Sequence, residues 1–392
     1  MGADSLNLPA QARRQVPHVL LVCSGLDHTQ RGFESFAREC FSVLRTQSGV
    51  HTELVKGSGP PGPGERSVPC LRRDRIPAQI LGRALRVRPF RLEAAFFALS
   101  LEPLLLHRKP DVVYVSEWDT ASALARLRHL TRRRFRLLLC NGSLAAEGFE
   151  RFDHVQDLTP AAHDYVLQRG ADSRRHTVLP LGFNIPPRLE AISEEERVAL
   201  RARLGLPERR KVVLSVATLD VTIKRLDYLI SEVAALPDPR PFLLLAGEPE
   251  AETPLLRKMA HRLLGADGFD MRTVPVQEIG DLYRASDVFV LTSVVESQGR
   301  ALIEAAAYGL PCIAHDSPNM RFSLGEHGMF ADMTRRRALT GLMEEVLAND
   351  AGARACTADA RHRHVYERFS WDCLTPQYVS LLRRVAGAPM SA

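Results

Sequence analysis

The segment from Asp287 to Ala314 constrains the fold more than any other part of the chain. It runs from an apolar stretch, Asp287-Val-Phe-Val-Leu-Thr, through a loop containing Gly299 and a short helical pattern closed by Gly309, into a second apolar stretch, Leu310-Pro-Cys-Ile-Ala. This order predicts a strand, a loop, a helix that ends at its glycine, and a second strand. Because strands joined through a helix lie parallel in one sheet, the segment predicts an α/β fold.

The same alternation extends along the chain and predicts two doubly wound parallel sheets. The first half opens with an apolar run at His18–Cys23, a polar loop and a helical pattern from Phe33 to Thr46. Ser193-Glu-Glu-Glu196 is a capping-box signal for a new helix that runs to Leu204, and we place a domain boundary between residues 187 and 188. The strands expected after it are Lys211–Ala217, Pro241–Ala246, Met271–Val274, Asp287–Leu291 and Pro311–Ala314.

Composition bounds the function classes. The chain has 392 residues, 45% of them hydrophobic, and no apolar run approaches the ~20 residues of a membrane-spanning helix. Met1 to Pro17 contains no apolar stretch of the kind found in secretory signals. The seven cysteines lack metal-type spacing, which favours a reducing, cytoplasmic location. Asp-x-Asp does not occur, so we expect no catalytic metal ion and no cofactor.

Glu296 and Glu304 stand eight residues apart and form the strongest candidate binding pair. The first lies in the loop after a predicted strand, and the second lies in the helix that follows. Ligands of open α/β sheets bind at this edge, where the N–H groups of Gly299, Arg300 and Ala301 would meet a phosphate. The two carboxylates can accept hydrogen bonds from hydroxyls on both sides of a phosphate. A nucleotide-sugar has this arrangement of groups. The alternative is that both glutamates are ordinary solvated residues.

This segment, Asp287 to Pro318, resembles the donor-site signature of retaining glycosyltransferases of family 4. The family pattern of Glu, seven residues, Glu, a small-residue helix and Gly-Leu-Pro is complete here, with Gln298 where many members carry Phe. The resemblance implies that Glu296 contacts the hydroxyls of the donor sugar and that Glu304 binds the ribose. The remaining donor-site residues that we expect are Gly32, Val276, Ser297, Gln298, Gly299, Arg300 and Ala301.

The resemblance also implies the GT-B architecture, in which two Rossmann-like domains face each other across a cleft. Arg174–Gly182 resembles the strand and loop that close the first domain, and Phe369-Ser-Trp371 resembles the start of the last helix. In that architecture the last helix crosses back to the first domain. We therefore expect an acceptor domain over residues 1–187 and 371–392, and a donor domain over residues 188–370.

Lys224 and Arg225 lie in the loop after the first strand of the second domain. A cation there can neutralise the charge that builds on a departing diphosphate, whereas the alternative is a solvated pair near a helix start. The family carries an Arg and a Lys in this loop, and Lys224 matches the Lys. Because Thr218 occupies the usual Arg position, we expect Arg225 to supply the missing charge. We assign Lys224, Arg225 and Glu296 to catalysis.

Polar residues also follow the strands of the first domain. Gly32 matches a family glycine beside the donor phosphate, and His28 and Arg31 share its loop. Asn141 stands where many members carry a sugar-contacting His, although an Asn-Gly turn explains it equally well. We select Asn141, Glu117, Asp119 and His28 as acceptor-site candidates.

Arginine runs around residues 72–91 and 126–136 make the first domain basic, and the net charge of the chain is +6. Three interpretations stay open: docking on anionic lipid at the membrane periphery, binding of an anionic acceptor, and solvated helix faces. Nucleic acid is not an expected partner, because the arginines lack interleaved aromatic residues.

The sequence thus predicts a metal-independent, retaining transfer of a sugar from a UDP- or GDP-sugar to an acceptor hydroxyl. The acceptor stays open between a small natural product and a cell-envelope glycan or lipid. The alternatives are an epimerase or phosphorylase on the same fold and a non-catalytic nucleotide-sugar binding protein.

Overall fold

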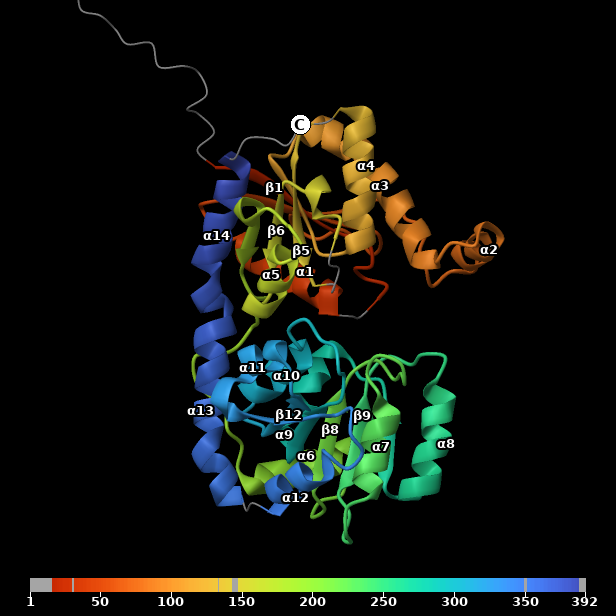
Figure 1. Ribbon diagram of the computed structural model, residues 1–392, viewed down its shortest axis with the longest axis vertical. Helices are drawn as coiled ribbons and strands as arrows, with labels where there is room; N and C mark the ends of the chain where they lie inside the picture. The colour runs from red at the N-terminus through yellow and green to blue at the C-terminus, as the bar shows by residue number, and fades with distance from the viewer. Residues whose placement is uncertain (1–15, 30–31, 133, 143–146, 349–350, 388–392) are drawn as a thin grey trace, which may run out of the picture. The chain divides into compact units, whose positions relative to one another are not determined.

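The computed structural model describes residues 16–29, 32–132, 134–142, 147–348 and 351–387, so Met1–Gln15 and Arg31 lie outside the described part. The chain forms two compact α/β units (Figure 1). The first unit comprises the chain up to Asp157, Tyr165–Leu179 and the chain from Thr375 onward. The second comprises Leu158–Asp164 and Pro180–Leu374.

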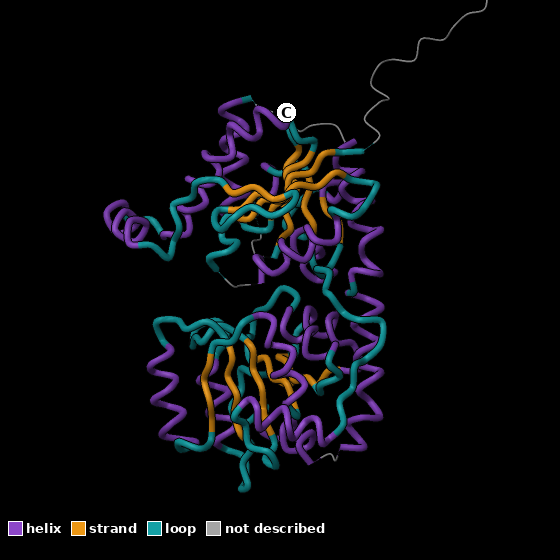
Figure 2. The backbone as a smooth tube through the Cα atoms, turned by 180° about the vertical axis from the view of Figure 1, so that it is seen from behind, coloured by secondary structure: helices purple, strands orange, loops and turns teal. Residues whose placement is uncertain are grey.

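The first unit contains a parallel sheet in the order β3-β2-β1-β4-β5-β6-β7 (Figure 2). Its strands are β1 (His18–Cys23), β2 (His51–Lys56), β3 (Glu65–Ser67), β4 (Val112–Val115), β5 (Arg136–Asn141), β6 (His154–Asp157) and β7 (His176–Val178). Its helices are α1 (Gly32–Leu44), α2 (Ile76–Leu85), α3 (Pro89–Arg108), α4 (Trp118–Thr131), most of α5 (Pro160–Leu167) and most of α14 (Trp371–Gly387).

Helices cover both faces of this sheet, as its apolar strands require. On one face, Leu20 and Val113 pack with Phe97 of α3 and Leu124 of α4. On the other, the ring of Phe36 in α1 packs edge-on against Tyr114 of β4 and also against Tyr378 of α14. Tyr378 accepts a 3.0 Å hydrogen bond from Gln156 Nε2, which ties the C-terminal helix to β6. The expected return of the last helix to the first domain is confirmed.

The second unit contains a parallel sheet in the order β10-β9-β8-β11-β12-β13. Its strands are β8 (Val212–Val216), β9 (Phe242–Ala246), β10 (Phe269–Arg272), β11 (Val288–Leu291), β12 (Cys312–His315) and β13 (Gly328–Ala331). Its helices are α6 (Glu194–Leu204), α7 (Leu226–Ala234), α8 (Thr253–Leu264), α9 (Ile279–Ala285), α10 (Arg300–Ala307), α11 (Pro318–Leu324), α12 (Thr340–Ala348) and α13 (Ala351–Phe369). Strand order reverses between β8 and β11, which makes their carboxyl ends a ligand-binding position.

Some elements agree with the sequence pattern and others do not. The expected capping box is present, because Ser193 Oγ accepts from the N–H of Glu196 at 3.2 Å and Glu196 Oε2 accepts from the N–H of Ser193 at 2.7 Å. The expected strand Met271–Val274 begins earlier, at Phe269. The structure adds β2, β3, β13 and α2 to the predicted elements. None of the helices in the described ranges combines the length and apolar composition needed to cross a bilayer.

Candidate active site

The loop between β8 and α7 is organised by the carboxylate of Asp220. Its Oδ1 accepts hydrogen bonds from the backbone N–H groups of Ile223 and Lys224 at 2.6 and 2.8 Å, and its Oδ2 accepts from Thr218 Oγ1 at 2.7 Å. Asp220 is buried. An aspartate that closes a turn on backbone N–H groups fixes the path of the loop, which here sets the direction of Lys224.

Lys224 and Glu296 form an ion pair across the switch point of the sheet. The Lys224 ammonium contacts Glu296 Oε1, and their side chains are 23% and 14% exposed. Thr292 Oγ1 donates to the Lys224 carbonyl at 2.6 Å, which ties the loop after β11 to the loop after β8. Two residues 72 positions apart in sequence are therefore held together with their charged ends still reachable from solvent.

The end of the second loop holds α10 in place. Gly299 has φ +68°, and a Cβ added there would lie 3.2 Å from Met320 Sδ, so a side chain would be strained and crowded. Gln298 is fully buried, and its Oε1 accepts from the N–H of Leu181 at 2.8 Å. The Gln298 side chain therefore braces the loop from inside, and its role in donor binding stays a prediction.

Helix α10 begins without a side-chain cap. The first N–H groups of a helix have no intrahelical partners, so the backbone at Arg300 and Ala301 is suited to an anion. One turn later, Glu304 Oε2 accepts from Tyr283 Oη at 3.1 Å, and Glu304 Oε1 pairs with Arg300 Nη2 at 3.3 Å. Burial, and then the charge of Glu304, raises the pKa of Tyr283 well above its ordinary value, so this donor stays protonated.

The other predicted donor-site residues have different surroundings. Arg225 Nη1 donates to the Met333 carbonyl at 2.7 Å and its guanidinium lies over the Tyr228 ring, so it is held away from the role of a free phosphate ligand. Val276 is exposed four residues after the end of β10, and Ser297 is half-buried next to Glu296 in the sequence. Lys224 and Glu296 thus lie together, with Glu296 four residues before the start of α10, whereas Arg225 bonds the backbone at Met333.

In the first unit, Glu117 is buried and not available at the surface. Ser24 Oγ lies 2.9 Å from both Glu117 Oε1 and Glu93 Oε1, and the Ser24 N–H donates to Glu117 Oε2 at 2.8 Å. Burial raises the pKa of the Glu117 carboxyl above its ordinary value. The expectation of Glu117 as an acceptor ligand is corrected: it closes the loop after β1.

His28 is likewise part of a buried network. Its Nε2 lies 3.1 Å from Glu93 Oε2, and neither side chain is exposed. Burial alone opposes ionisation of Glu93, but its hydrogen bonds with His28 and with the Arg73 N–H outweigh this and lower its pKa. Arg73 also bonds Glu34 Oε1 at 3.0 Å. The network holds the β1 loop from three elements, so His28 is corrected from an acceptor ligand to a structural residue.

Asn141 ends β5 with its side chain buried, and its Nδ2 lies 3.4 Å from Asp157 Oδ1. Asp157 Oδ2 in turn pairs with His176 Nδ1 at 2.9 Å. An amide held in this way supports neighbouring strands, and the role of Asn141 in the acceptor site stays a prediction. Asp119 is half-buried in the first turn of α4, 3.6 Å from Arg91 Nε, and Gly32 is exposed at the start of α1. Asp119 and Gly32 are therefore both reachable from solvent.

Residues 196–363 match the family model described as "Glycosyl transferases group 1". This range begins inside α6 and contains the switch point, the Lys224–Glu296 pair and Glu304. Residues 196–363 form a group 1 glycosyltransferase domain. The signature read from the sequence is confirmed by this match.

Curated proteins are similar to parts of the chain. Mannosylfructose-phosphate synthase of Agrobacterium fabrum is 32% identical to the chain over 193 residues, which cover 46% of the chain and 42% of that enzyme. The chain spans about half the length of the curated relatives it matches.

Among solved structures, sucrose-phosphate synthase from Thermosynechococcus elongatus superposes with a TM-score of 0.78 at 20% identity, over 95% of this chain and all of that one. The HepE protein of Anabaena in complex with UDP-glucose gives 0.72 at 17% identity, over 94% of this chain and all of that one. Both superpositions show that the two-unit fold is of the GT-B type.

Proposed function

We propose that this protein transfers a hexosyl group from a UDP-sugar to an acceptor hydroxyl, with retention of anomeric configuration and without a catalytic metal ion. The observation that supports it most is the pairing of Lys224 with Glu296 at the switch point, beside the uncapped N-terminus of α10. The UDP-glucose complex of the Anabaena neighbour favours uridine over other bases.

The geometry gives each group a distinct task in this reaction. The α10 N–H groups and the Lys224 ammonium offer positive charge where a diphosphate leaving group would develop negative charge. Glu296 offers a carboxylate that accepts hydrogen bonds from sugar hydroxyls. Because both partners of the ion pair are partly exposed, each can exchange its partner for the substrate at little desolvation cost. Such fixed charges supply what a metal ion supplies in other phosphate-transfer sites.

Hydrolysis of the donor tests this function without knowledge of the acceptor. The full chain incubated with UDP-glucose should release UDP slowly, in proportion to enzyme, and at the same rate with and without EDTA. A binding module would bind UDP-glucose without releasing UDP. An epimerase would change the configuration of the sugar and leave it attached to UDP. Either of those outcomes overturns the assignment. Release of GDP from GDP-glucose, in place of UDP from UDP-glucose, would support the same reaction with guanine as the base of the donor.

Replacing Glu304 with alanine should weaken UDP binding by about tenfold to a hundredfold. The reason is that a carboxylate held by Tyr283 and Arg300 accepts the ribose hydroxyls, and hydrogen bonds to charged groups contribute about 1.5–3 kcal/mol each. Calorimetric titration of UDP measures the change. The control is Glu344→Ala, at an exposed glutamate of α12 in the same unit. Equal affinities of Glu304→Ala and the parent protein would remove Glu304 from the nucleotide site.

We propose that α2 docks on an anionic lipid surface, which would bring the active site to a membrane-associated acceptor. The helix extends away from the sheet of its unit in both views (Figures 1 and 2). It exposes Ile76, Ile80 and Leu85 by 70%, 60% and 56%, and the exposed arginines in and directly around it are Arg75, Arg83, Arg86 and Arg88. Apolar side chains among cations are the composition of an interfacial helix.

The double substitution Arg83→Ala and Arg86→Ala should reduce binding to phosphatidylglycerol vesicles by about thirtyfold, since each basic residue contributes about 1 kcal/mol at such a surface. Co-sedimentation measures the bound fraction, with phosphatidylcholine vesicles as the neutral reference. Arg126→Ala with Arg134→Ala, at exposed arginines in and beyond α4, is the matched control. Equal loss in both double variants would show general charge attraction, and the docking role of α2 would be rejected.

A further inference from the structure

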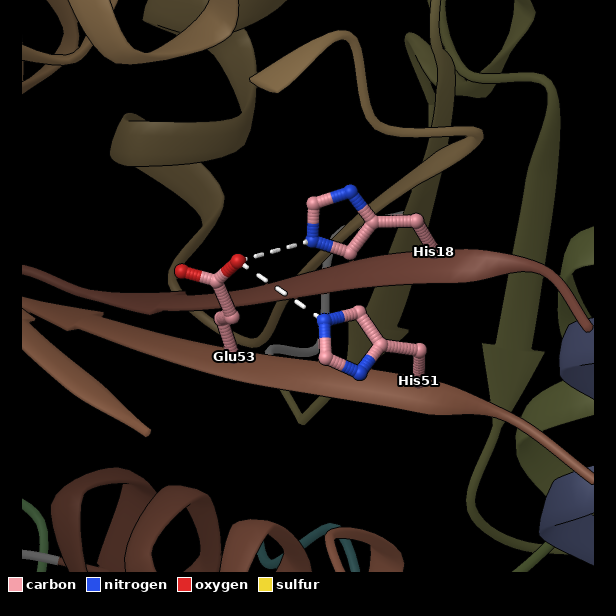
Figure 3. Close-up of side chains that lie close together, drawn as sticks. All are labelled: His18, His51 and Glu53. Atoms are coloured by element: carbon pink, nitrogen blue, oxygen red, sulfur yellow. Dashed lines mark ion pairs between the residues drawn. The ribbon is translucent and has the colours of Figure 1, made fainter. Parts of the chain in front are cut away.

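His18, His51 and Glu53 gather at the amino-terminal ends of β1 and β2 (Figure 3). Ser24 and Glu117 lie at the other end of the strands, because they follow the carboxyl ends of β1 and β4. His18 and His51 are register partners in the β1–β2 pairing, so their side chains lie next to each other. Glu53 follows His51 by two residues and therefore points to the same face of the strand. This convergence results from strand register alone and belongs to no part of the glycosyltransferase site.

The ligand atoms of the three side chains have the spacing of a metal site. His18 Nε2 lies 3.2 Å and His51 Nε2 lies 3.9 Å from the same oxygen, Glu53 Oε1. A tetrahedral Zn²⁺ site with bonds of about 2.0–2.1 Å has edges of about 3.3 Å between its ligands. The two imidazoles and the carboxylate therefore need only small side-chain shifts to enclose one ion. Figure 3 shows both rings turned toward the carboxylate.

The surroundings hold the cluster in this arrangement. Arg66 Nε donates to Glu53 Oε2 at 2.8 Å, which leaves Oε1 facing the imidazoles. The His18 N–H donates to Asp111 Oδ2 at 2.9 Å, and the His51 N–H donates to the Pro17 carbonyl at 2.9 Å. The backbone of each histidine is therefore held in position. Outer contacts of this kind orient metal ligands in proteins.

We propose that His18, His51 and Glu53 form a binding site for one Zn²⁺ ion, with solvent in the fourth position. His51 is 65% exposed and offers an entry path for the ion, whereas Glu53 is 8% exposed. The charged groups that face the cluster are Asp111, Arg66 and Arg108. The ion would crosslink the first two strands and act on the stability of this unit, away from the transfer chemistry.

Arg108 competes with this ion for the Glu53 carboxylate. Its Nη1 lies 3.6 Å from Glu53 Oε1, the oxygen assigned to zinc, and its side chain is 32% exposed. Because it can swing into solvent, the ion can displace it at the cost of one partly exposed ion pair. Removing its charge should therefore tighten metal binding, which is the opposite of what removal of a structural contact would do to a site.

Zinc titration into the full untagged chain tests the proposal, in a Cys356→Ser background because that thiol is exposed. One equivalent should bind at micromolar or lower concentration. The zinc affinity of His51→Ala should fall by more than about 10- to 100-fold, which is the loss typical of an outer contact. The zinc affinity of Arg108→Gln should rise several-fold. His129→Ala, at an exposed histidine of α4, should match the parent. Co²⁺ should give a tetrahedral absorption spectrum without a thiolate charge-transfer band.

Zinc should also raise the melting temperature of the parent and of His129→Ala but not that of His51→Ala. Donor hydrolysis at room temperature should be the same in all these variants, so failure of this site and failure of the proposed function are read separately. The proposal is overturned if the parent binds no equivalent of zinc. It is overturned equally if His51→Ala retains parental affinity, or if the Co²⁺ spectrum reports thiolate ligands.

Discussion

Turnover of the donor should fall by about a hundredfold or more when Lys224 is replaced by alanine. The Lys224 ammonium stands at the switch point, where it pairs with the Glu296 carboxylate. A hydrogen-bond donor directed at developing negative charge contributes about 2.7–4 kcal/mol to stabilisation of the transition state. Because this charge develops as the diphosphate leaves, the loss should appear in kcat far more than in KM. Steady-state kinetics of UDP release from UDP-glucose measures both.

Two further substitutions make the kinetic result specific. Lys224→Arg keeps the charge with altered geometry and should recover part of the rate. Lys258→Ala removes an exposed lysine of α8 in the same unit and should leave the rate unchanged. If Lys224→Ala retained parental kcat, Lys224 would have no part in the departure of the diphosphate.

Replacing Asp287 with alanine should destabilise the protein by about 3–5 kcal/mol. Asp287 is almost fully buried, and its Oδ2 accepts from Arg201 Nη2 and from the Val212 N–H, both at 2.7 Å. Its Oδ1 accepts from Arg197 Nη1 at 3.1 Å. Removing the carboxylate leaves the guanidinium of a buried arginine without its counter-ion, beside a strand N–H that has lost its acceptor.

Urea unfolding monitored by circular dichroism measures this loss as a shift of the midpoint. The matched variant is Asp281→Ala, whose partner Arg203 is well exposed, so that pair should contribute less than about 1 kcal/mol. Equal midpoints for the two variants would contradict the buried network. If folded Asp287→Ala still binds UDP, the substitution acts on the stability of the protein and not on the binding site.

The sequence predicted the parts of the fold that depend on apolar runs. Strands such as β9 and β11 are continuous hydrophobic stretches because both sheet faces are covered, so their position is visible in composition alone. Strand β2 escaped prediction because it includes buried charges. Lys56 is buried only because Asp27 and Glu65, from a loop and from β3, each lie 2.6 Å from its ammonium. Such pairing depends on tertiary contacts that no local pattern reports.

The candidate site shows the same division. Glu296, Glu304 and Lys224 were predicted because each follows a strand end in a recognisable spacing, and the structure brings Lys224 and Glu296 together. Gln298 and Arg225 were assigned to the donor from the family resemblance, and Glu117 to the acceptor because it follows a strand at the carboxyl end of the sheet. In the structure each instead bonds backbone or side-chain groups of the loops themselves. Whether a polar side chain faces the ligand or the loop depends on loop conformation, which the sequence pattern does not specify.

Asp220 is a residue that the sequence analysis did not single out. Aspartate in a loop favours turns because its carboxylate accepts from nearby backbone N–H groups, and here those of Ile223 and Lys224 set the position of Lys224. Tyr283 gave no such signal, because its contact with Glu304 joins α9 to α10 across 21 residues.

A crystal structure of the full chain with bound UDP would show whether the nucleotide lies at the switch point of the second sheet. We expect the diphosphate within hydrogen-bond distance of the Lys224 ammonium and of the first N–H groups of α10, with the ribose hydroxyls on Glu304. A diphosphate bound elsewhere on the second unit, with Lys224 still paired to Glu296 and the α10 N-terminus facing solvent, would contradict this expectation.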